Sequence, residues 1–332
     1  MQYTKLGTTG LRISRLAFGA GPISTLMTGN AFDRQVAVLE RAVQSGVNWI
    51  DTAASYGNGH SEANVGRALR RMDERGTVQI ATKVRLTGPD LQDIPGSIER
   101  SCASSLQRLG VDRVTLLQLH NSITTHRDDE PTSITPDDVL QPGGVLEAFE
   151  KLRARGWVEH LGLTGLGQPQ ALRTVVQSQA FATIQLPYNL MNPSAGRAMS
   201  QGFPECDYGQ IIDDCVAQGM GVMAIRVFAA GALVGQDPAP HTLTTRFFPL
   251  DLYRRDQQRA RRMQQRIFCD MPMAEASLRF VLSNPHVATA IIGFAHPEQI
   301  DEALKYLRGG TLDQAQLDLL AEFDYRIGQA VD

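Results

Sequence analysis

The sequence predicts an α/β protein of the (β/α)8 TIM-barrel class, with an N-terminal β-hairpin and an extra C-terminal helix. Three observations support this: short apolar runs alternate with helical patterns, eight such units follow one another, and most connections between them are short. Strands that alternate with helices form parallel sheets covered by those helices. Eight regular units favour a closed barrel over an open sheet. We therefore expect residues 1–332 to form a single domain, because this barrel reaches such a length around one core.

The elements follow in order from the N-terminus. A turn-rich segment, residues 6–11, lies between short apolar stretches and predicts the hairpin. The apolar runs expected to be the barrel strands are residues 16–20, 47–51, 78–83, 114–120, 160–164, 183–186, 222–227 and 288–293. The helical patterns after them are residues 32–45, 61–71, 94–109, 145–155, 169–178, 207–218, 273–283 and 297–307, and the extra helix spans residues 312–327. These helices are predicted from apolar residues at the 3.6-residue period, such as Leu39 and Ala42 in the first.

Two connections are much longer than the others. Residues 121–144 are polar and contain several prolines, and residues 235–272 contain many arginines. Both follow predicted strands, so both are expected as loops at the mouth of the barrel, where the strands end. Long loops at this end commonly shape substrate sites.

Composition and charge limit the classes of function. The formal net charge is −3, so no strong field is expected to attract nucleic acid or an anionic membrane. The chain contains no apolar run long enough to span a membrane, and its N-terminus lacks the apolar segment of a secretion signal. The cysteines, Cys102, Cys206, Cys215 and Cys269, form no C-x-x-C pair. We expect reduced thiols and a cytoplasmic location.

Four reactive side chains lie at the ends of three consecutive predicted strands. Asp51 ends the second strand, Tyr56 lies in the turn after it, Lys83 ends the third strand and His120 ends the fourth. Function in this fold is carried by residues at these strand ends. We therefore expect a carboxylate, a phenol, an amine and an imidazole to meet at one side of the mouth.

This combination suits proton transfer to a carbonyl oxygen. An ammonium beside a phenol favours the phenolate and makes the phenol a stronger acid, and Lys83 can supply that charge. Asp51 can hold Lys83 in place, while His120 can donate a hydrogen bond to the carbonyl oxygen. Carbonyl reduction also needs a hydride, which must come from a cofactor.

Each of these residues has a common structural role when it occurs alone, so the prediction rests on their joint placement.

Two other motifs in the sequence do not match the functional sites that they suggest. Gly19-Ala20-Gly21 is not a dinucleotide-binding loop, because Ser24 takes the position of the third glycine. His120 and His126 lack the spacing and partners of a zinc pair, so no metal site is expected.

Longer motifs resemble those of the aldo-keto reductase family. Residues 48–57 (Asn-Trp-Ile-Asp-Thr-Ala-Ala-Ser-Tyr-Gly) and 61–66 (Ser-Glu-Ala-Asn-Val-Gly) are similar to the signature of that family. Lys83 and His120 match its two remaining catalytic positions, and residues 6–19 and 184–189 match further stretches. The resemblance implies a (β/α)8 barrel, a nicotinamide cofactor and reversible conversion between a carbonyl and an alcohol. It makes Tyr56 the general acid, tuned by Lys83 and Asp51, with His120 orienting the carbonyl.

The resemblance also implies which residues bind the cofactor. They are Gly19, Asp51, Thr164, Gln185, Arg226, Phe228, Gly293, Phe294, Gln299 and Glu302. The family commonly has Ser-Asn to hold the nicotinamide carboxamide at the place where this chain has Thr164-Gly165. The groups that remain to contact the carboxamide are the hydroxyl of Thr164 and the amide of Gln185. Arg226 stands where an aromatic ring often stacks on the nicotinamide, and it either stacks through its guanidinium plane or forms a salt bridge.

The adenosine end of the predicted site departs further from the family. Gly293, Phe294 and Gln299 stand where NADP-preferring relatives have a cation, a hydroxyl and an arginine. Because a 2′-phosphate prefers Arg or Lys, NADP and NAD both stay open, although the family favours NADP. Three arginines of the second long loop, Arg254, Arg255 and Arg259, either compensate or form a solvated helix face.

Two other functions are alternatives to this oxidoreductase. One is a regulatory subunit of the same fold that binds the cofactor but has little turnover, as some family members that act on channels do. The other is a metal-dependent barrel hydrolase, which lacks a ligand cluster in this sequence. The sequence does not determine the carbonyl or alcohol substrate, the direction of the reaction or the oligomeric state.

Overall fold

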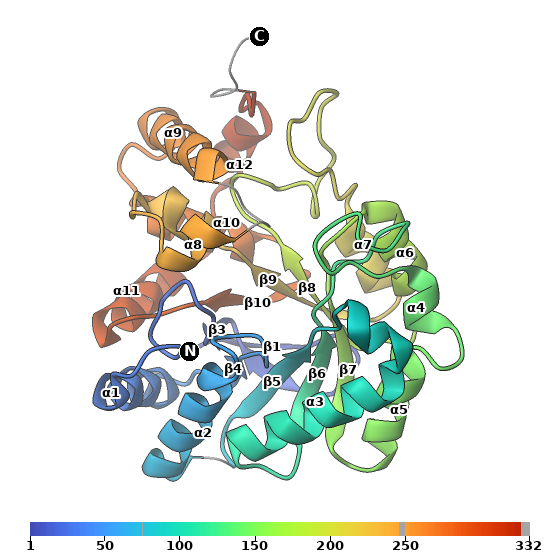
Figure 1. The fold of residues 1–332 in the computed structure, drawn as a ribbon. Helices are drawn as coiled ribbons and strands as arrows, with labels where there is room; N and C mark the ends of the chain where they lie inside the picture. Colours follow the sequence, from blue (N-terminus) through green and yellow to red (C-terminus); the bar gives the residue numbers. More distant parts are fainter. Residues whose placement is uncertain (75, 246–249, 327–332) are drawn as a thin grey trace.

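The computed structural model of the protein describes residues 1–74, 76–245 and 250–326, and its centre is a closed barrel of parallel strands. The strands are β3 (Leu16–Gly19), β4 (Trp49–Asp51), β5 (Gln79–Val84), β6 (Val114–Leu119), β7 (Val158–Thr164), β8 (Thr183–Pro187), β9 (Gly221–Ile225) and β10 (Val287–Ile292). Each pairs with the next, and β10 closes the barrel by pairing with β3. The predicted eight-stranded barrel is therefore confirmed (Figure 1).

A hairpin of β1 (Tyr3–Lys5) and β2 (Arg12–Ser14) precedes the barrel, as predicted. Its turn packs directly on the start of β9. A Cβ added to Gly7, whose φ is 52°, would lie 2.3 Å from the backbone nitrogen of Gly221, so only glycine allows this approach. Leu6 and Ile13 are buried in the same apolar cluster as Trp49 of β4. The hairpin therefore seals the barrel at the end where the strands begin.

Helices surround the barrel and bury their apolar faces against the strands (Figure 1). Those that follow the strands are α1 (Phe32–Gln44), α2 (His60–Met72), α3 (Ile94–Leu109), α5 (Val145–Ala154), α6 (Pro169–Val176), α7 (Ile211–Ala217), α10 (Met273–Ser283) and α11 (Pro297–Arg308). Each corresponds to a predicted helix. In α1, Leu39 and Ala42 are fully buried, which is the amphipathic pattern that the sequence shows.

The long connections contain more structure than the sequence predicts. Residues 235–272, expected as a loop, include α8 (Pro240–Thr244) and the long helix α9 (Leu250–Arg266). The buried face of α9 carries Tyr253, Asp256, Arg259, Ala260 and Met263. Because charged residues occupy two of these positions, the apolar periodicity that would reveal a helix is hidden. The connection at residues 121–144 contains the short helix α4 (Pro136–Leu140).

Two short 3-10 helices lie in the connections of the described chain, η1 (Gly88–Gln92) after β5 and η2 (Ala229–Val234) after β9. Two helices differ from the prediction in where they begin or end. Helix α7 begins later than predicted because Gly209 and Gln210 have φ values of 55° and 62°, outside the helical region. The extra helix α12 (Gln314–Ala321) is shorter than the predicted 312–327, whose last residue lies outside the described ranges.

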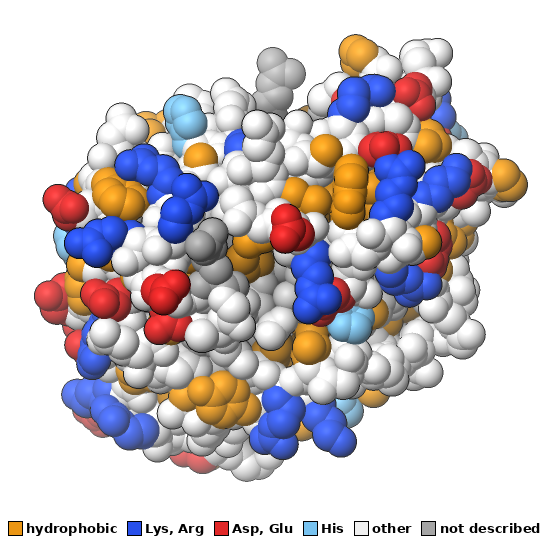
Figure 2. Space-filling view, turned by 90° about the horizontal axis from the view of Figure 1, so that it is seen from below, with side chains coloured by type: hydrophobic (Ala, Val, Ile, Leu, Met, Phe, Trp, Pro, Cys, Tyr) orange, Lys and Arg blue, Asp and Glu red, His pale blue; other side chains and the backbone are white. Residues whose placement is uncertain are grey.

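Charges of both signs are mixed over the surface. Figure 2 shows Lys and Arg side chains interspersed with Asp and Glu on the face in view. Within the described part of the chain, no helix is both long and apolar enough to cross a membrane.

Candidate active site

A cavity of about 1070 Å³ lies at the end of the barrel where the strands terminate. Every residue predicted to contact a cofactor lines this cavity, from Gly19 and Asp51 to Glu302. Of the predicted catalytic residues, Asp51, Tyr56 and His120 also line it. Lys83 lies behind them and has an exposed fraction of only 1%. The structure therefore brings all the predicted site residues to one place.

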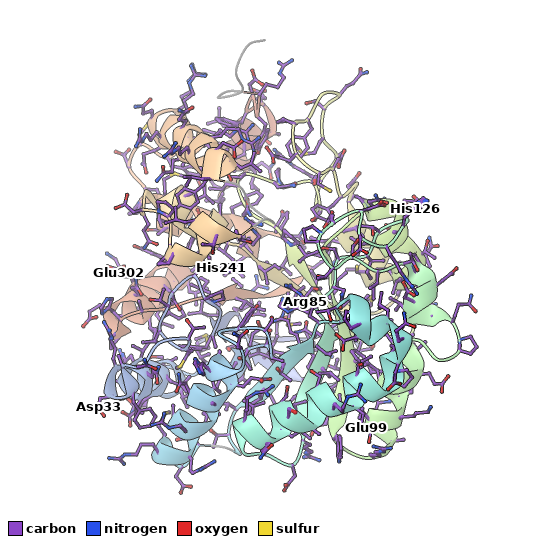
Figure 3. All side chains as sticks on the ribbon, viewed as in Figure 1. Asp33, Arg85, Glu99, His126, His241 and Glu302 are labelled. Carbon is purple, nitrogen blue, oxygen red and sulfur yellow. The ribbon has the colours of Figure 1, made fainter. Side chains whose placement is uncertain are left out.

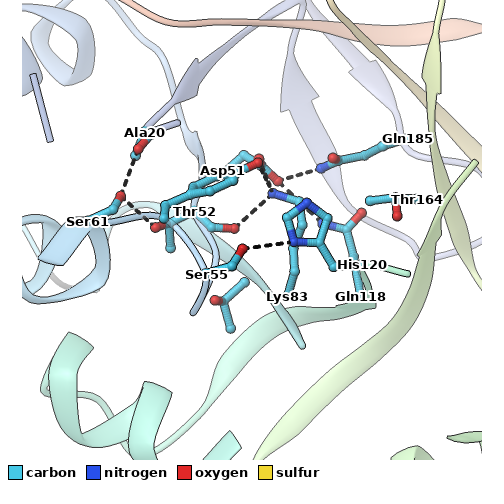
Figure 4. A network of polar contacts seen from close by, with 12 residues as sticks. Ala20, Asp51, Thr52, Ser55, Ser61, Lys83, Gln118, His120, Thr164 and Gln185 are labelled. Atoms are coloured by element: carbon cyan, nitrogen blue, oxygen red, sulfur yellow. Dashed lines mark hydrogen bonds and ion pairs between the residues drawn. The ribbon is translucent and has the colours of Figure 1, made fainter. Parts of the chain in front are cut away.

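Lys83 is the centre of a buried polar network (Figure 4). Its Nζ donates to Oδ2 of Asp51 at 2.5 Å, to the backbone oxygen of Thr52 at 2.8 Å and to Oη of Tyr56 at 3.2 Å. These bonds use the three donors of the ammonium group. Burial alone would lower the pKa of Lys83, but the neighbouring Asp51 and Tyr56 raise it above its usual value. Lys83 is therefore positively charged at neutral pH.

Asp51 is held by two amides as well as by the lysine. Nε2 of Gln118 donates to Oδ1 of Asp51 at 3.3 Å, and Nε2 of Gln185 donates to the same oxygen. A buried carboxylate needs such donors, and here both its oxygens have them. Gln185, predicted to hold the nicotinamide carboxamide, thus also orients Asp51.

Gln118 is a site residue that the sequence analysis missed. It lies in β6 two residues before His120, so both side chains lie on the same side of the chain. This alternation is a signal that could have indicated it.

Tyr56 and His120 are neighbours in the cavity wall. Their ring centroids are 5.6 Å apart in an edge-to-face arrangement, and Nδ1 of His120 lies 3.2 Å from Oγ of Ser55. Because Lys83 donates to the phenol oxygen, the proton of Tyr56 is available to a group in the cavity. Burial, together with the charges of Arg85 and Lys83, lowers the pKa of His120 well below 6.5. The imidazole is therefore neutral at pH 7 and can donate one hydrogen bond.

The side chains predicted at the nicotinamide end have partners of their own. Oγ1 of Thr164 donates to the backbone oxygen of Leu119 at 2.9 Å. Burial lowers the pKa of Arg226, whereas Tyr208, Asp256 and Glu205 raise it. Arg226 lines the cavity together with Phe228. Stacking on the nicotinamide and a salt bridge both stay predictions for Arg226.

The adenosine end is formed by the connection from β10 to α11. The ring of Phe294 is buried against that of Phe18, with centroids 6.1 Å apart. Oε1 of Gln299 accepts hydrogen bonds from the backbone nitrogens of Ala295 and His296 at 2.7 and 3.2 Å, so Gln299 caps the first turn of α11. Glu302 is exposed at the outer end of the cavity.

Of the three arginines of α9, Arg254 is on the solvated face of the helix, whereas Arg255 and Arg259 have neither of the predicted roles. Arg255 and Arg259 both pair with Glu205, at 2.5 and 2.7 Å, and Arg259 has no exposed surface. Only Arg254 is exposed. None of the three is among the described residues that line the cavity. Burial against Glu205 is the physical reason why neither cofactor binding nor a solvated face describes Arg255 and Arg259.

Arg85 is a second residue that the sequence analysis missed. It lines the cavity one residue beyond the end of β5, and its Nη2 lies 3.4 Å from the backbone oxygen of His120. Its position two residues after Lys83 was the available signal. Among the described residues, no three His, Cys, Asp or Glu side chains are grouped as they would be around a metal ion.

The fold and the site together define a class of protein, a (β/α)8-barrel oxidoreductase whose mouth holds a tyrosine, a lysine, an aspartate and a histidine. The model of the Aldo/keto reductase family matches residues 15–324, and the chain belongs to that family.

Known relatives cover nearly the whole chain at low identity. The chain is 25% identical to D-threo-aldose 1-dehydrogenase of a Pseudomonas species, over 90% of each chain. It is 26% identical to pyridoxal 4-dehydrogenase of Microbacterium luteolum, over 96% of each chain. Among solved structures, the holo form of the aldo-keto reductase AKR11C1 from Bacillus halodurans is similar, with a TM-score of 0.72 at 22% identity. The likeness covers 97% of this chain and 96% of that one, and it supports the fold.

Proposed function

We propose that this protein is an NAD(P)-dependent oxidoreductase that interconverts a carbonyl (aldehyde, ketone or sugar) and an alcohol, with Tyr56 as the general acid and base. One observation carries the proposal: Lys83 contacts Asp51, Thr52 and Tyr56 at once, directly behind the wall of the cavity. This is the arrangement that a phenol needs to exchange a proton at neutral pH. Two relatives that are dehydrogenases by name support the same class of reaction.

The residues present fit a dinucleotide cofactor, NADP or NAD. The cavity runs from Tyr56 to Glu302, and glycines keep parts of its wall free of side chains. One of them is Gly21, where an added Cβ would be in ordinary van der Waals contact with the ring of Tyr56, at 3.6 Å. When bound, the nicotinamide supplies a hydride to the carbonyl carbon. Gln299 caps α11 through its carbonyl oxygen and offers no positive charge for a 2′-phosphate, so NADP and NAD both stay open.

The side chains of the site then have distinct tasks. Tyr56 gives its proton to the carbonyl oxygen of the substrate, and the ammonium of Lys83 stabilises the phenolate that remains. Asp51 holds Lys83 charged and in place. The neutral His120 donates a hydrogen bond to the same carbonyl oxygen and orients it. In the reverse direction the phenolate accepts the proton of the alcohol.

The variant Tyr56→Phe tests this proposal. It removes the proton donor and leaves the ring, so we expect binding of NADPH and NADH, followed by fluorescence, to change less than about threefold. The value of kcat with a panel of aldehydes, ketones and sugars should fall by about 10²- to 10⁴-fold, the usual contribution of a positioned acid. Unchanged turnover in this variant rules out the proposed mechanism.

A matched control is Tyr306→Phe, because Tyr306 lines the same cavity at the end of Glu302. This substitution also removes one phenol from the cavity but lies away from Lys83. We expect its kcat to stay within about threefold of the original. An equal loss of activity in both variants would assign the effect to cavity structure instead of proton transfer.

A further inference from the structure

The imidazole of His120 has two nitrogens, and the structure gives them different surroundings. Nδ1 lies 3.2 Å from Oγ of Ser55, which is a hydrogen-bond distance (Figure 4). Within the described part of the chain, no side chain or backbone group forms a hydrogen bond with Nε2, and His120 lines the cavity. Nε2 is therefore the nitrogen that is left for a ligand in the cavity.

The backbone of β5 holds Ser55 and His120 at this distance from each other. Ser55 lies in the turn between β4 and α2, and the backbone nitrogen of Ala54 in this turn donates to the backbone oxygen of Lys83 at 3.3 Å. The backbone nitrogen of His120 donates to the backbone oxygen of Val84 at 2.8 Å. Two residues that are 65 positions apart in the chain are thus fixed to neighbouring residues of one strand. The register of the barrel therefore sets the distance between Oγ and Nδ1.

The remaining contacts of His120 fix the ring but do not determine where its proton lies. The ring of Tyr56 packs edge-to-face against it, and Nη2 of Arg85, which lies one residue beyond β5, donates to the backbone oxygen of His120 at 3.4 Å (Figure 3). The lowered pKa of His120 keeps the ring neutral at pH 7. A neutral imidazole carries one proton, on either nitrogen, and the hydrogen bond of one nitrogen decides which of them carries it.

The two tautomers of His120 present opposite groups to the cavity. If the hydroxyl of Ser55 donates to Nδ1, the proton is on Nε2 and an N–H group faces the ligand. If Nδ1 donates to Oγ of Ser55, Nε2 has only a lone pair. A serine hydroxyl can take either role. A carbonyl oxygen has only lone pairs to offer, so it can bond to the first tautomer and not to the second.

We propose that Ser55 is a positioning residue, whose hydroxyl donates to Nδ1 of His120 and thereby keeps the imidazole proton on Nε2, where it faces the substrate. The proposal rests on the carbonyl–alcohol function given above and adds a residue to its mechanism. Ser55 acts through His120 and does not itself bond to the carbonyl oxygen. A purely structural Ser55 would support the turn before α2 without changing the tautomer, and a substrate-binding Ser55 would change KM.

Nuclear magnetic resonance of the full chain, labelled with ¹⁵N in its histidines, measures the tautomer directly. The chain has 7 histidines, and the signals of His120 are those that disappear in His120→Gln. At pH 7 we expect the proton on Nε2 in the unaltered protein. In Ser55→Ala both tautomers should be present, and Ser55→Thr, which keeps the hydroxyl, should restore the original spectrum. A proton on Nδ1 in the unaltered protein, or an unchanged tautomer in Ser55→Ala, overturns the proposal.

Steady-state kinetics with the best substrate of the panel measure the consequence for catalysis. In Ser55→Ala, kcat should fall about 10- to 100-fold, as activity does when a partner that orients a metal-bound histidine is removed. KM and cofactor binding should each change less than about threefold, and Ser55→Thr should keep kcat within about threefold of the original. A rise in KM with unchanged kcat in Ser55→Ala would make Ser55 a substrate-binding residue and overturns the proposal.

The control variant is Ser104→Ala. Oγ of Ser104 donates to the backbone oxygen of Arg100 within α3 at 2.8 Å, and Ser104 is not among the described residues that line the cavity. This variant should change neither the tautomer nor kcat.

The magnetic resonance measurement needs no turnover, so it separates failure of this inference from failure of the proposed function. If the tautomer of His120 depends on Ser55 but no carbonyl compound is turned over, the positioning role stands and only the proposed reaction fails. If turnover depends on Tyr56 while Ser55→Ala changes neither the tautomer nor kcat, the positioning role fails and the reaction stands.

Discussion

Two buried ionic clusters lie near the mouth of the barrel, and they differ in how completely their charges are matched. The barrel cluster consists of Asp51 and Lys83 at the ends of β4 and β5. The α9 cluster consists of Glu205, Arg255, Asp256 and Arg259 and joins α9 to the segment before α7. Both oxygens of Asp51 accept hydrogen bonds. Oδ1 of Asp256 accepts none from any described residue and is 3.6 Å from each of the two arginines.

The pKa of Asp256 shows the consequence of this difference. Burial, together with the charge of Glu205, raises it to about 6, although Arg255, Arg259 and Arg226 act in the opposite direction. In the barrel cluster the pKa of Lys83 is raised despite burial, so its charged form is favoured. The charged form of a buried group is thus favoured where hydrogen bonds satisfy all its polar atoms, and it is disfavoured where one atom lacks such a bond. In the function proposed above, cofactor and substrate would meet the first kind of cluster.

The largest effect on kcat should come from removing the positive charge of the barrel cluster. In Lys83→Met, Tyr56 loses its neighbouring ammonium and Asp51 loses its partner, so kcat should fall about 10³-fold. Steady-state kinetics at saturating cofactor measure this. Lys305→Met, which removes an exposed lysine of α11, is the control and should keep full activity. A loss of less than about tenfold in Lys83→Met would show that the barrel cluster does not tune Tyr56.

A pH-dependent effect on stability should come from the α9 cluster. The pKa of Asp256 in the folded protein lies above its ordinary value of 3.8, so the folded state binds the proton more tightly than the unfolded state. The contribution of Asp256 to stability is therefore present below pH 3.8 and is lost as the pH rises through about 6. We expect Asp256→Asn to gain up to about 3 kcal/mol in free energy of unfolding, relative to the original, between pH 4 and pH 7.5.

Urea unfolding at a series of pH values measures this difference. The control is Asp301→Asn, because Asp301 is half exposed and pairs with Arg41 at the surface. Its stability relative to the original protein should change little with pH. If the difference in free energy of unfolding between Asp256→Asn and the original protein is constant over the whole pH range, the folded protein does not disfavour the charged carboxylate of Asp256. This carboxylate would then be satisfied as well as that of Asp51.

A smaller effect on kcat should come from removing one hydrogen bond from the carboxylate of the barrel cluster, so that it is less well satisfied, as in the α9 cluster. Gln118→Met removes one of the two amides that donate to Oδ1 of Asp51 and keeps the volume similar. A hydrogen bond to a charged group contributes about 1.5–3 kcal/mol, of which the remaining donors restore a part. We expect kcat to fall about tenfold and cofactor binding to stay unchanged. Gln168→Met, at a partly exposed position beside Asp129, is the control and should have no effect on kcat.

The sequence predicts the barrel cluster well and the α9 cluster not at all. Apolar runs locate the ends of strands, so Asp51, Lys83 and His120 can be assigned to one side of the mouth from the sequence alone. Tyr56 lies in the turn after the second strand, so its role as the acid can be inferred from its placement beside Lys83 and agrees with the resemblance to a family. The bonds from Gln118 and Gln185 depend on the register between strands, such as Lys83 opposite Gln118, which periodicity does not specify.

The α9 cluster was missed because its helix violates the usual rule of apolar burial. Asp256 and Arg259 occupy core positions of α9, whereas the arginines of this segment suggested a cofactor contact or a solvated helix face. The capping role of Gln299 was missed for a different reason. Gln299 is recognisable in the sequence as a replacement for an arginine, but its use as a helix cap depends on the chain direction at Ala295 and His296, which the sequence does not specify.

The pairing of β3 with β10 has a consequence for synthesis on the ribosome. Leu16 lies opposite Ala290, so the two edges that must join are made 274 residues apart. At about 5–20 residues per second, the edge of β3 waits roughly 15–50 s for its partner. Until then the nascent chain exposes unpaired strand edges, which are sites of aggregation. Chains interrupted before β10 should therefore depend on chaperones in a way that the finished ring does not.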